Sequence, residues 1–147
     1  MEDNSLCKFA DEINNLLPII MREFTKRQAK ELCKNKITFP QFFIIDYLYK
    51  QGPSTMTGLA KFMGITTAAM TGMVDRLIEP GYCQRIYDTY DRRIIRIKIA
   101  PSGKEIAKKV NQERRQTIIN VFCQLSAKER REYLRILRHI YEIIISK

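Results

Sequence analysis

The sequence predicts a mainly α-helical chain with one small β-hairpin, and three observations predict it. Apolar residues recur at helical spacing over most of the chain. Glycine and proline divide residues 56–81 into two short helices. Between residues 82 and 99, isoleucines alternate with Arg or Lys in the period of two that marks strands. With 147 residues and 45% hydrophobic residues, the chain is long enough for one domain with a real core.

Residues 6–33 are predicted to form the first helix. Its apolar stripe has intervals of three and four residues: Ile13, Leu16, Leu17, Ile20 and Phe24. Pro18 lies inside this stripe, and an interior proline usually kinks or restarts a helix. We therefore expect either a bend near Leu17 or a short lead-in followed by the main helix.

A second helix is predicted to begin at Thr38, because Thr38 and Gln41 have the spacing of a capping box. Pro40 falls in the first turn, where a missing N–H costs little. The helix is predicted to end at residues 51–54. Its expected buried stripe is Phe42, Ile45, Leu48 and Tyr49.

The two short helices of residues 56–81 are separated by Gly64, which permits the positive φ of a tight turn. Thr57 is the expected cap of the first helix, and Thr66 or Thr67 that of the second. The expected inward residues are Leu59, Ala60 and Met63 in the first helix, and Ala69, Met70, Met73 and Leu77 in the second. The small side chain of Ala60 is expected to let the two helices cross closely. The apolar side chain of Met70 is expected to pack the second helix against the first.

Residues 82–87 and 94–99 are predicted to form the hairpin, joined by a polar turn over residues 88–91. Two short helices with a glycine turn, followed directly by a hairpin with a basic tip, form a winged helix-turn-helix. We therefore assign residues 37–100 to a DNA-binding domain of this fold class.

Residues 101–147 are predicted to be helical, with a break at residues 125–126 and a second capping box formed by Ser126 and Glu129. Two adjacent apolar stripes run along the final helix: Leu134, Leu137, Tyr141 and Ile144, and Ile136, Ile140 and Ile143. Such a face is wider than the core of one subunit needs. We therefore assign residues 1–36 and 101–147 to helices of a homodimer, with a single broad core face as the alternative.

The segments MTGLAKFMGITTAAMTGMVDRLIEPGYCQR and DTYDRRIIRIKIAPSG resemble the MarR family of transcriptional regulators. The resemblance implies an obligate homodimer on pseudo-palindromic DNA. In many members of the family, a small phenolic or lipophilic ligand, or cysteine oxidation, releases the DNA. This chain has Ile99-Ala100 where the family usually has Leu-Thr, so a helix cap is missing. Pro101 in the first turn, or Ser102 as a displaced cap, is expected to compensate.

The outward positions of the second short helix are the predicted DNA contacts. Thr67, Ala68, Thr71 and Gly72 are expected to meet base edges in the major groove. Arg76 is expected to contact phosphate, or else to pair near Asp75.

At the hairpin tip, Arg92 and Arg93 are expected to approach the minor groove. The family pattern gives the minor-groove role to Arg93, with Asp91 orienting it. A solvated basic turn is the alternative. Arg85 and Arg96 lie on the strands and are expected to touch DNA backbone or water.

A regulatory site is expected where the terminal helices meet the winged module. Phe42, Phe43 and Tyr47 are candidates for an effector pocket, with plain core packing as the alternative. Aromatic or Met residues of the first helix, near residues 13–21, are further candidates. Cys7 and Cys33 are candidates for redox sensing because lysines nearby could stabilise a thiolate. Cys123 is interpreted as a core residue.

The formal net charge is +10, and eleven basic against five acidic residues follow residue 100. This balance favours a polyanionic partner, here double-stranded DNA. A single histidine, no CxxC pair and no glycine-rich phosphate loop argue against an enzyme, a metal site or a cofactor. No apolar run of membrane length and no signal peptide are visible, so we expect a cytoplasmic protein without membrane contact.

The predicted function is a sequence-specific transcriptional regulator, most simply a ligand-responsive repressor. The alternatives are a redox-sensing regulator that acts through a cysteine thiol, and a winged-helix interaction module without specific DNA binding.

Overall fold

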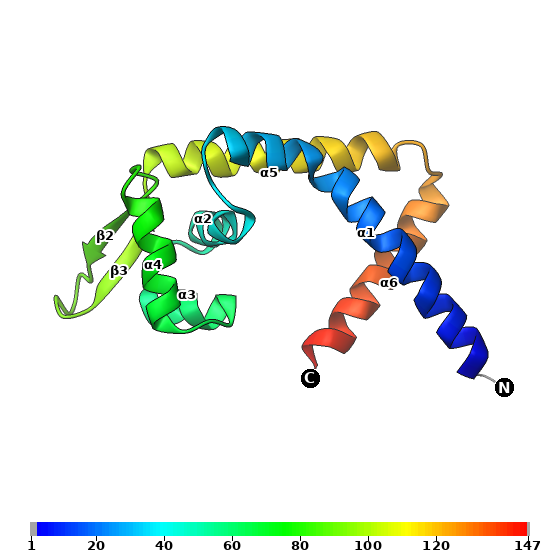
Figure 1. The fold of residues 1–147 in the computed structure, drawn as a ribbon, viewed down its shortest axis with the longest axis horizontal. Coiled ribbons are helices and arrows are strands. Elements are labelled where there is room, and N and C mark those ends of the chain that lie inside the picture. The colour runs from blue at the N-terminus through cyan, green and yellow to red at the C-terminus, as the bar shows by residue number, and fades with distance from the viewer. Residues whose placement is uncertain (1–2, 147) are drawn as a thin grey trace.

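The computed structural model describes residues 3–146, which form six helices and a three-stranded antiparallel sheet. A winged unit lies at one end of the molecule, and helices extend from it toward the N-terminus (Figure 1). The elements in chain order are α1 (Asp3–Lys34), α2 (Phe39–Gln51), β1 (Ser54–Thr55), α3 (Met56–Met63), α4 (Thr67–Ile78), β2 (Cys83–Tyr87), β3 (Ile95–Ile99), α5 (Pro101–Phe122) and α6 (Ala127–Ile145). The fold is thus mainly α-helical with a small sheet, as predicted.

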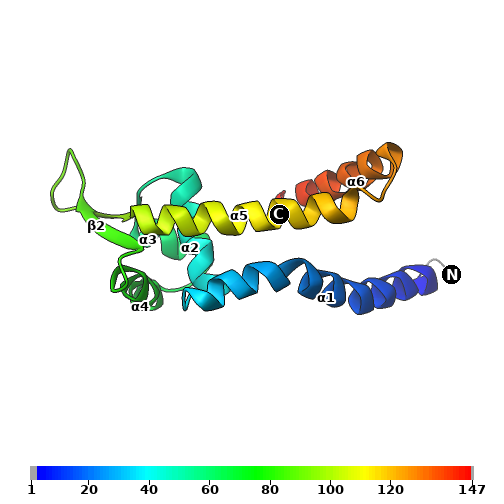
Figure 2. The same ribbon diagram turned by 90° about the horizontal axis from the view of Figure 1, so that it is seen from above.

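Helix α1 is 32 residues long and continuous through Pro18. The interpretation of a separate short lead-in is therefore wrong, and Figure 1 shows the helix axis changing direction part-way along. The second half of α1 runs beside α5 in both views (Figures 1 and 2). The first half projects away from the winged unit and leaves its apolar side chains exposed.

The start of α2 confirms the predicted capping box. The Thr38 Oγ1 atom accepts from the Gln41 N–H at 3.3 Å, and the Gln41 Oε1 atom accepts from the Thr38 N–H at 2.9 Å. Phe42, Ile45 and Leu48 are buried as expected. Tyr49 is exposed instead, because the buried face is centred on Phe42, Ile45 and neighbouring Ile44. Gly52 ends the helix with φ 83°.

Both short helices begin at threonine caps, but the first cap is displaced from its predicted position. Thr55, not Thr57, caps α3 by accepting from the Gly58 N–H at 3.0 Å. Thr66 caps α4. Gly64 ends α3 in the left-handed region at φ 65°, as its predicted turn role requires.

Helix α4 buries Met70, Val74 and Leu77, which recur at intervals of four and three residues. Ala69 was predicted to face inward and is exposed, so that prediction is wrong. Met73 is half-buried against the core. The inner face is thus rotated slightly from the predicted one, and Ala69 belongs to the outer face.

The sheet has the order β1-β3-β2, and its third strand was not predicted. Strand β1 pairs through Ser54 with Ile97 and through Thr55 with Arg96. The predicted hairpin is present, with each strand one residue shorter than expected. Ile97 and Ile99 are buried on the face that meets the helices.

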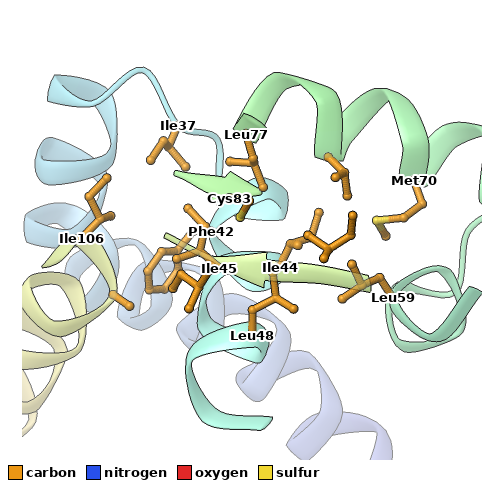
Figure 3. Close-up of a cluster of buried hydrophobic side chains, with 14 of the residues drawn as sticks. Ile37, Phe42, Ile44, Ile45, Leu48, Leu59, Met70, Leu77, Cys83 and Ile106 are labelled. Atoms are coloured by element: carbon orange, nitrogen blue, oxygen red, sulfur yellow. The ribbon is translucent and has the colours of Figure 1, made fainter. Parts of the chain in front are cut away.

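One hydrophobic core joins α2, α3, α4, the sheet and the adjacent parts of α1 and α5 (Figure 3). Phe42, Ile44 and Ile45 of α2 lie at its centre with no exposed surface, next to Leu59 and Met70. The first turns of α5 complete the core through Ile106 and Ala107. This core holds the hairpin and α4 in fixed positions relative to α5.

The start of α5 is packed tightly against the turn that follows α4. Ala100 caps α5 without a side-chain hydrogen bond, and Pro101 occupies the first turn. The Ser102 hydroxyl donates to the Gly81 carbonyl oxygen at 2.8 Å, so the predicted role of Ser102 as a displaced cap is wrong. A β-carbon on Gly103 would overlap the Tyr82 carbonyl oxygen, so only glycine fits there.

Helix α6 begins at the predicted Ser126–Glu129 capping box and has no buried residue. Its apolar side chains are 42–67% exposed: Leu134, Ile136, Leu137, Ile140, Tyr141, Ile143, Ile144 and their neighbours. The first half of α1 and α6 cross in Figure 1, yet Figure 2 shows them apart. Within the described chain, no helix is both long and apolar enough to cross a lipid bilayer.

Candidate nucleic-acid interface

The outer face of α4 is the first part of the candidate interface. Thr67, Ala68 and Gly72 are exposed there, in the positions that the sequence predicted. Ala69 joins them on the same face. A β-carbon on Gly72 would meet nothing within 4 Å, so this glycine leaves open space at the surface. The face is nearly free of charge and presents small side chains that allow a close approach.

Thr71 is half-buried on the edge of this face. Its Oγ1 atom donates to the Thr67 carbonyl oxygen at 2.8 Å, a bond within the helix. The hydroxyl proton is therefore already used in the free protein. The methyl group and the hydroxyl lone pairs remain for a partner, and a methyl group is suited to contact the methyl group of thymine.

Asp75 and Arg85 connect α4 to the hairpin. The Arg85 Nη2 atom of β2 donates to Asp75 Oδ1, and both side chains are about half exposed. The sequence did not predict this protein partner of Arg85. Arg76, next along α4, is exposed and makes no ion pair with any residue that the structure describes.

Asp88 organises the hairpin loop from its first residue. Its Oδ2 atom accepts from Arg96 Nε at 2.6 Å, and its Oδ1 atom accepts from the N–H groups of Tyr90 and Asp91 at 2.9 and 3.3 Å. These hydrogen bonds hold the pKa of Asp88 below its usual value, and the one from Arg96 has the largest effect. The sequence did not predict this partner of Arg96.

Asp91 acts on the backbone of the next loop residues. Its Oδ1 atom accepts from the Arg93 N–H at 3.0 Å, so it fixes the main chain of Arg93 and not its guanidinium group. Arg92 and Arg93 are both exposed and take part in no ion pair between described residues. Both carboxylates of the loop thus accept hydrogen bonds from protein groups, whereas both guanidinium groups are left exposed.

The loop carries a feature that the sequence analysis missed. Tyr90, at the tip, is almost fully exposed, and Tyr87 and Ile95 are exposed cross-strand partners below it. The sequence did show an aromatic residue, Tyr90, among the polar residues of this turn, but the turn was assigned only as polar. The hairpin projects beyond the body of the molecule at the end opposite the N-terminus (Figures 1 and 2).

A groove of about 780 Å³ lies where α1, α2, α5 and α6 meet. Of the three predicted pocket residues, Phe43 lines it. Phe42 is fully buried in the core, and Tyr47 packs on Phe62 with 4.3 Å between ring centroids, so neither lines the groove. Met21 of the first helix also lines the groove, in the region where the sequence predicted further pocket residues. The walls from the last two helices were not predicted, because these helices are far from α2 in the sequence: Ile118 and Phe122 of α5, and Tyr133, Leu134 and Leu137 of α6.

Four polar side chains interrupt the apolar walls of this groove, and one of them, Thr25, donates to the Met21 carbonyl oxygen at 2.8 Å. Gln28 is buried and donates to the Phe24 carbonyl oxygen at 3.2 Å. Arg130 donates to the Leu125 carbonyl oxygen at 2.6 Å, at the end of α5. Arg114 lies with its guanidinium carbon 5.9 Å from the centre of the Phe42 ring. The arrangement is suited to a mainly apolar molecule with a small polar or anionic end.

All four cysteines carry free thiols. Cys7 and Cys33 are exposed as redox sensing would require, and Cys33 lines a second concavity of about 710 Å³ with Arg27, Lys30 and Lys34. Cys123 was interpreted as core and is exposed, because α5 ends there without covering helices. Burial raises the pKa of Cys83 to about 12. No group of three or more His, Cys, Asp or Glu residues in the described chain is placed to hold a metal ion.

Known proteins resemble this chain in both sequence and fold. The sequence model of the MarR family matches residues 37–95, which span α2 to the start of β3. The HTH-type transcriptional regulator YsmB of Bacillus subtilis is 29% identical over 105 residues, 71% of this chain and 72% of that protein.

Among solved structures, a MarR family protein from Bacillus stearothermophilus has a TM-score of 0.81 at 26% identity. It covers 94% of this chain, which in turn covers 96% of that protein. A MepR-like protein complexed with pseudoligands is 31% identical with a TM-score of 0.56, over 91% of this chain and 94% of its own.

Proposed function

The chain belongs to the MarR family of winged helix-turn-helix transcriptional regulators, and we propose that it is a sequence-specific repressor that binds a pseudo-palindromic operator as a homodimer. One observation carries this proposal. The outer face of α4, which is nearly free of charge, lies beside a hairpin whose tip presents Arg92 and Arg93 (Figure 1). The small side chains of the helix suit contact with base edges, and the exposed arginines of the hairpin suit contact with phosphates and the minor groove.

In this proposal the residues divide into three groups. Thr67, Ala68, Thr71 and Gly72 meet base edges in the major groove, while Arg76 contacts phosphate. Arg93 enters the minor groove with Arg92 beside it, and Asp91 holds the main chain of Arg93 in place. Residues 37–100 form the DNA-binding domain, and residues 1–36 and 101–147 supply the helices of the dimer.

The exposed apolar faces of α1 and α6 support the homodimer. The first half of α1 and the whole of α6 lie outside the winged unit (Figure 2), and no residue of α6 is buried within one chain. Exposed aliphatic surface of this extent is costly in water unless another surface covers it. A second copy of the chain offers the same two faces for mutual burial.

The groove between α1, α2, α5 and α6 is the proposed effector site, for a small lipophilic or phenolic ligand. Its apolar walls and the buried Gln28 support this assignment. The MepR-like relative, which is 31% identical, was solved with pseudoligands bound. Because the groove includes both α5 and α2, a bound ligand would change how the winged unit sits on the dimer helices.

The experiment is selection of bound sequences from a random DNA library, followed by binding measurements on the best sequence. A pseudo-palindromic motif is expected, and binding to shuffled DNA at the same salt concentration should be weaker. Selection of no motif would contradict sequence-specific binding.

Thr71→Ala should change the preferred bases, since only the side chain at this base-facing position is altered. Thr117→Ala is a matched control, because Thr117 makes the same bond to a carbonyl four residues earlier, at 2.9 Å, but lies on α5. If both variants select the motif of the parent protein, Thr71 does not read bases.

A further inference from the structure

The tip of the hairpin carries an aromatic side chain with no contact to cover it. Tyr90 is 99% exposed, more than any other large hydrophobic residue in the described chain. Tyrosine is a large amphipathic side chain that gains free energy when its ring is covered. The fully exposed position is therefore unfavourable for Tyr90 in the isolated protein and suggests a partner surface.

Hydrogen bonds within the loop fix the main chain at Tyr90. Its main-chain N–H donates to Asp88 Oδ1 at 2.9 Å, while Asp88 Oδ2 is held by Arg96 on the neighbouring strand. The Asp88 side chain itself is largely buried. The loop thus fixes the main chain of Tyr90, and the side chain is exposed before any partner arrives.

The surroundings of Tyr90 select the chemistry of that partner. Both carboxylates of the loop are engaged, since Asp88 holds Tyr90 and Arg96, and Asp91 holds the main chain of Arg93. The groups turned outward are then one aromatic ring and two guanidinium groups. A surface that suits them has apolar walls flanked by regularly spaced anions.

The minor groove of DNA is such a surface, because deoxyribose rings form its walls and phosphates its rims. We propose that Tyr90 is a further DNA-contacting residue of the wing, with its ring packed on deoxyribose beside the phosphate and minor-groove contacts of Arg92 and Arg93. This inference rests on the proposed function. It adds a contact that does not depend on charge to a wing that otherwise binds through cations.

The first test compares the operator affinity of Tyr90→Ala, Tyr90→Phe and the parent protein over a series of salt concentrations. Loss of the ring contact should weaken binding by roughly tenfold, which corresponds to uncovering part of one aromatic side chain. The slope of log K against log salt should stay unchanged, because no phosphate neutralisation is lost. Tyr90→Phe keeps the ring and should bind like the parent.

Tyr49→Ala serves as the matched control, since Tyr49 is an exposed tyrosine on α2. If Tyr90→Ala binds as tightly as Tyr49→Ala while Arg93→Ala is weakened, the Tyr90 contact is refuted and the proposed function stands. If the parent protein binds no DNA sequence preferentially, the proposed function fails instead. If Tyr90→Phe is as weak as Tyr90→Ala, the hydroxyl is the contact and packing of the ring is refuted.

A second readout does not depend on affinity. The chain contains no tryptophan, so Tyr90→Trp places a single fluorescent reporter at the tip. Operator binding should protect this tryptophan from quenching by acrylamide, whereas a Tyr49→Trp reporter should show no change. Equal quenching of the Tyr90→Trp protein with and without operator would overturn the proposal.

Discussion

Asp75 on α4 and Arg85 on β2 form an ion pair that joins the helix proposed to read bases to the strand that leads into the wing. Both side chains are about half exposed, so the pair contributes little to folding stability, on the order of 0–1 kcal/mol. Its larger effect concerns charge. Arg85 covers a carboxylate that would otherwise face the phosphates of a bound duplex.

This relationship predicts an asymmetry between the two partners. Arg85→Ala should weaken binding to every DNA sequence, because a cation is lost and the Asp75 carboxylate is uncovered. Asp75→Asn in the same chain should restore part of the loss, and thermal unfolding should shift little in either protein. The measurement is a double-mutant cycle of operator affinity. Additive effects of the two substitutions would show that Asp75 and Arg85 act independently on DNA.

Arg93→Ala tests the wing itself. It should weaken binding to all sequences and reduce the slope of log K against log salt by about one per protomer, because one phosphate-neutralising cation is removed. Arg131→Ala on α6 is the control for loss of an arginine far from the wing. An unchanged affinity and salt slope for Arg93→Ala would make the assignment of the wing wrong.

Substitution of two glycines by alanine should change the free energy of unfolding in opposite directions. A β-carbon on Gly103 would overlap the Tyr82 carbonyl oxygen and come within 2.9 Å of Ile99 Cγ1. Gly103→Ala should therefore lower the free energy of unfolding by roughly 1–3 kcal/mol. Gly72→Ala meets open space in a helix and should raise it by up to about 1 kcal/mol. Chemical denaturation measures both, and equal stability of the two variants would contradict the packing of α5 on Tyr82.

The thiols should fall into two classes. Cys7, Cys33 and Cys123 are exposed and should react with a thiol reagent in the native protein, whereas Cys83 should react only after unfolding. Because burial raises the pKa of Cys83 from 9.0 to about 12, the fold favours the neutral thiol. The stabilisation from Cys83 is therefore complete below pH 9 and is lost as the pH rises toward 12. Cys83→Ala should lose less stability than the parent over that range, and four fast-reacting thiols would contradict the burial of Cys83.

The dimer has its own test on α6. Ile140→Asp places a carboxylate in the exposed apolar face, where association would bury it, and should shift the mass measured by light scattering toward the monomer. Arg135→Ala, on the polar side of the same helix, should keep the mass of the parent. A dimeric Ile140→Asp protein would mean that this face is not the interface.

Local chemistry made much of the fold predictable. The capping boxes at Thr38 and Ser126 depend on side chains three residues apart, and both are present as predicted. The cap of α3 was misplaced because Thr55 also belongs to a strand of two residues, too short to show a period. The inner face of α4 was misjudged because small Ala69 fits either face, whereas Val74 is fully buried in the core.

The candidate site was predictable where a residue's role follows from its position on one element. The outer face of α4 and the arginines of the hairpin tip follow from periodicity and turn chemistry. The ion-pair partners of Arg85 and Arg96 could not be predicted in this way. Each pair joins residues eight or ten positions apart on different segments, and a local pattern does not show how those segments pack. Phe42 and Phe43 are neighbours, and only packing decides that the first is core and the second lines the groove.

Helix α5 runs unbroken for 22 residues from its tight junction with Tyr82 to the corner before α6. A one-residue insertion in its middle would turn everything beyond it by about 100° and lengthen it by about 1.5 Å. The number of residues in α5 therefore sets the orientation of the winged unit relative to the outer helices. An insertion or deletion in α5 that preserves this orientation must amount to a nearly whole number of helical turns.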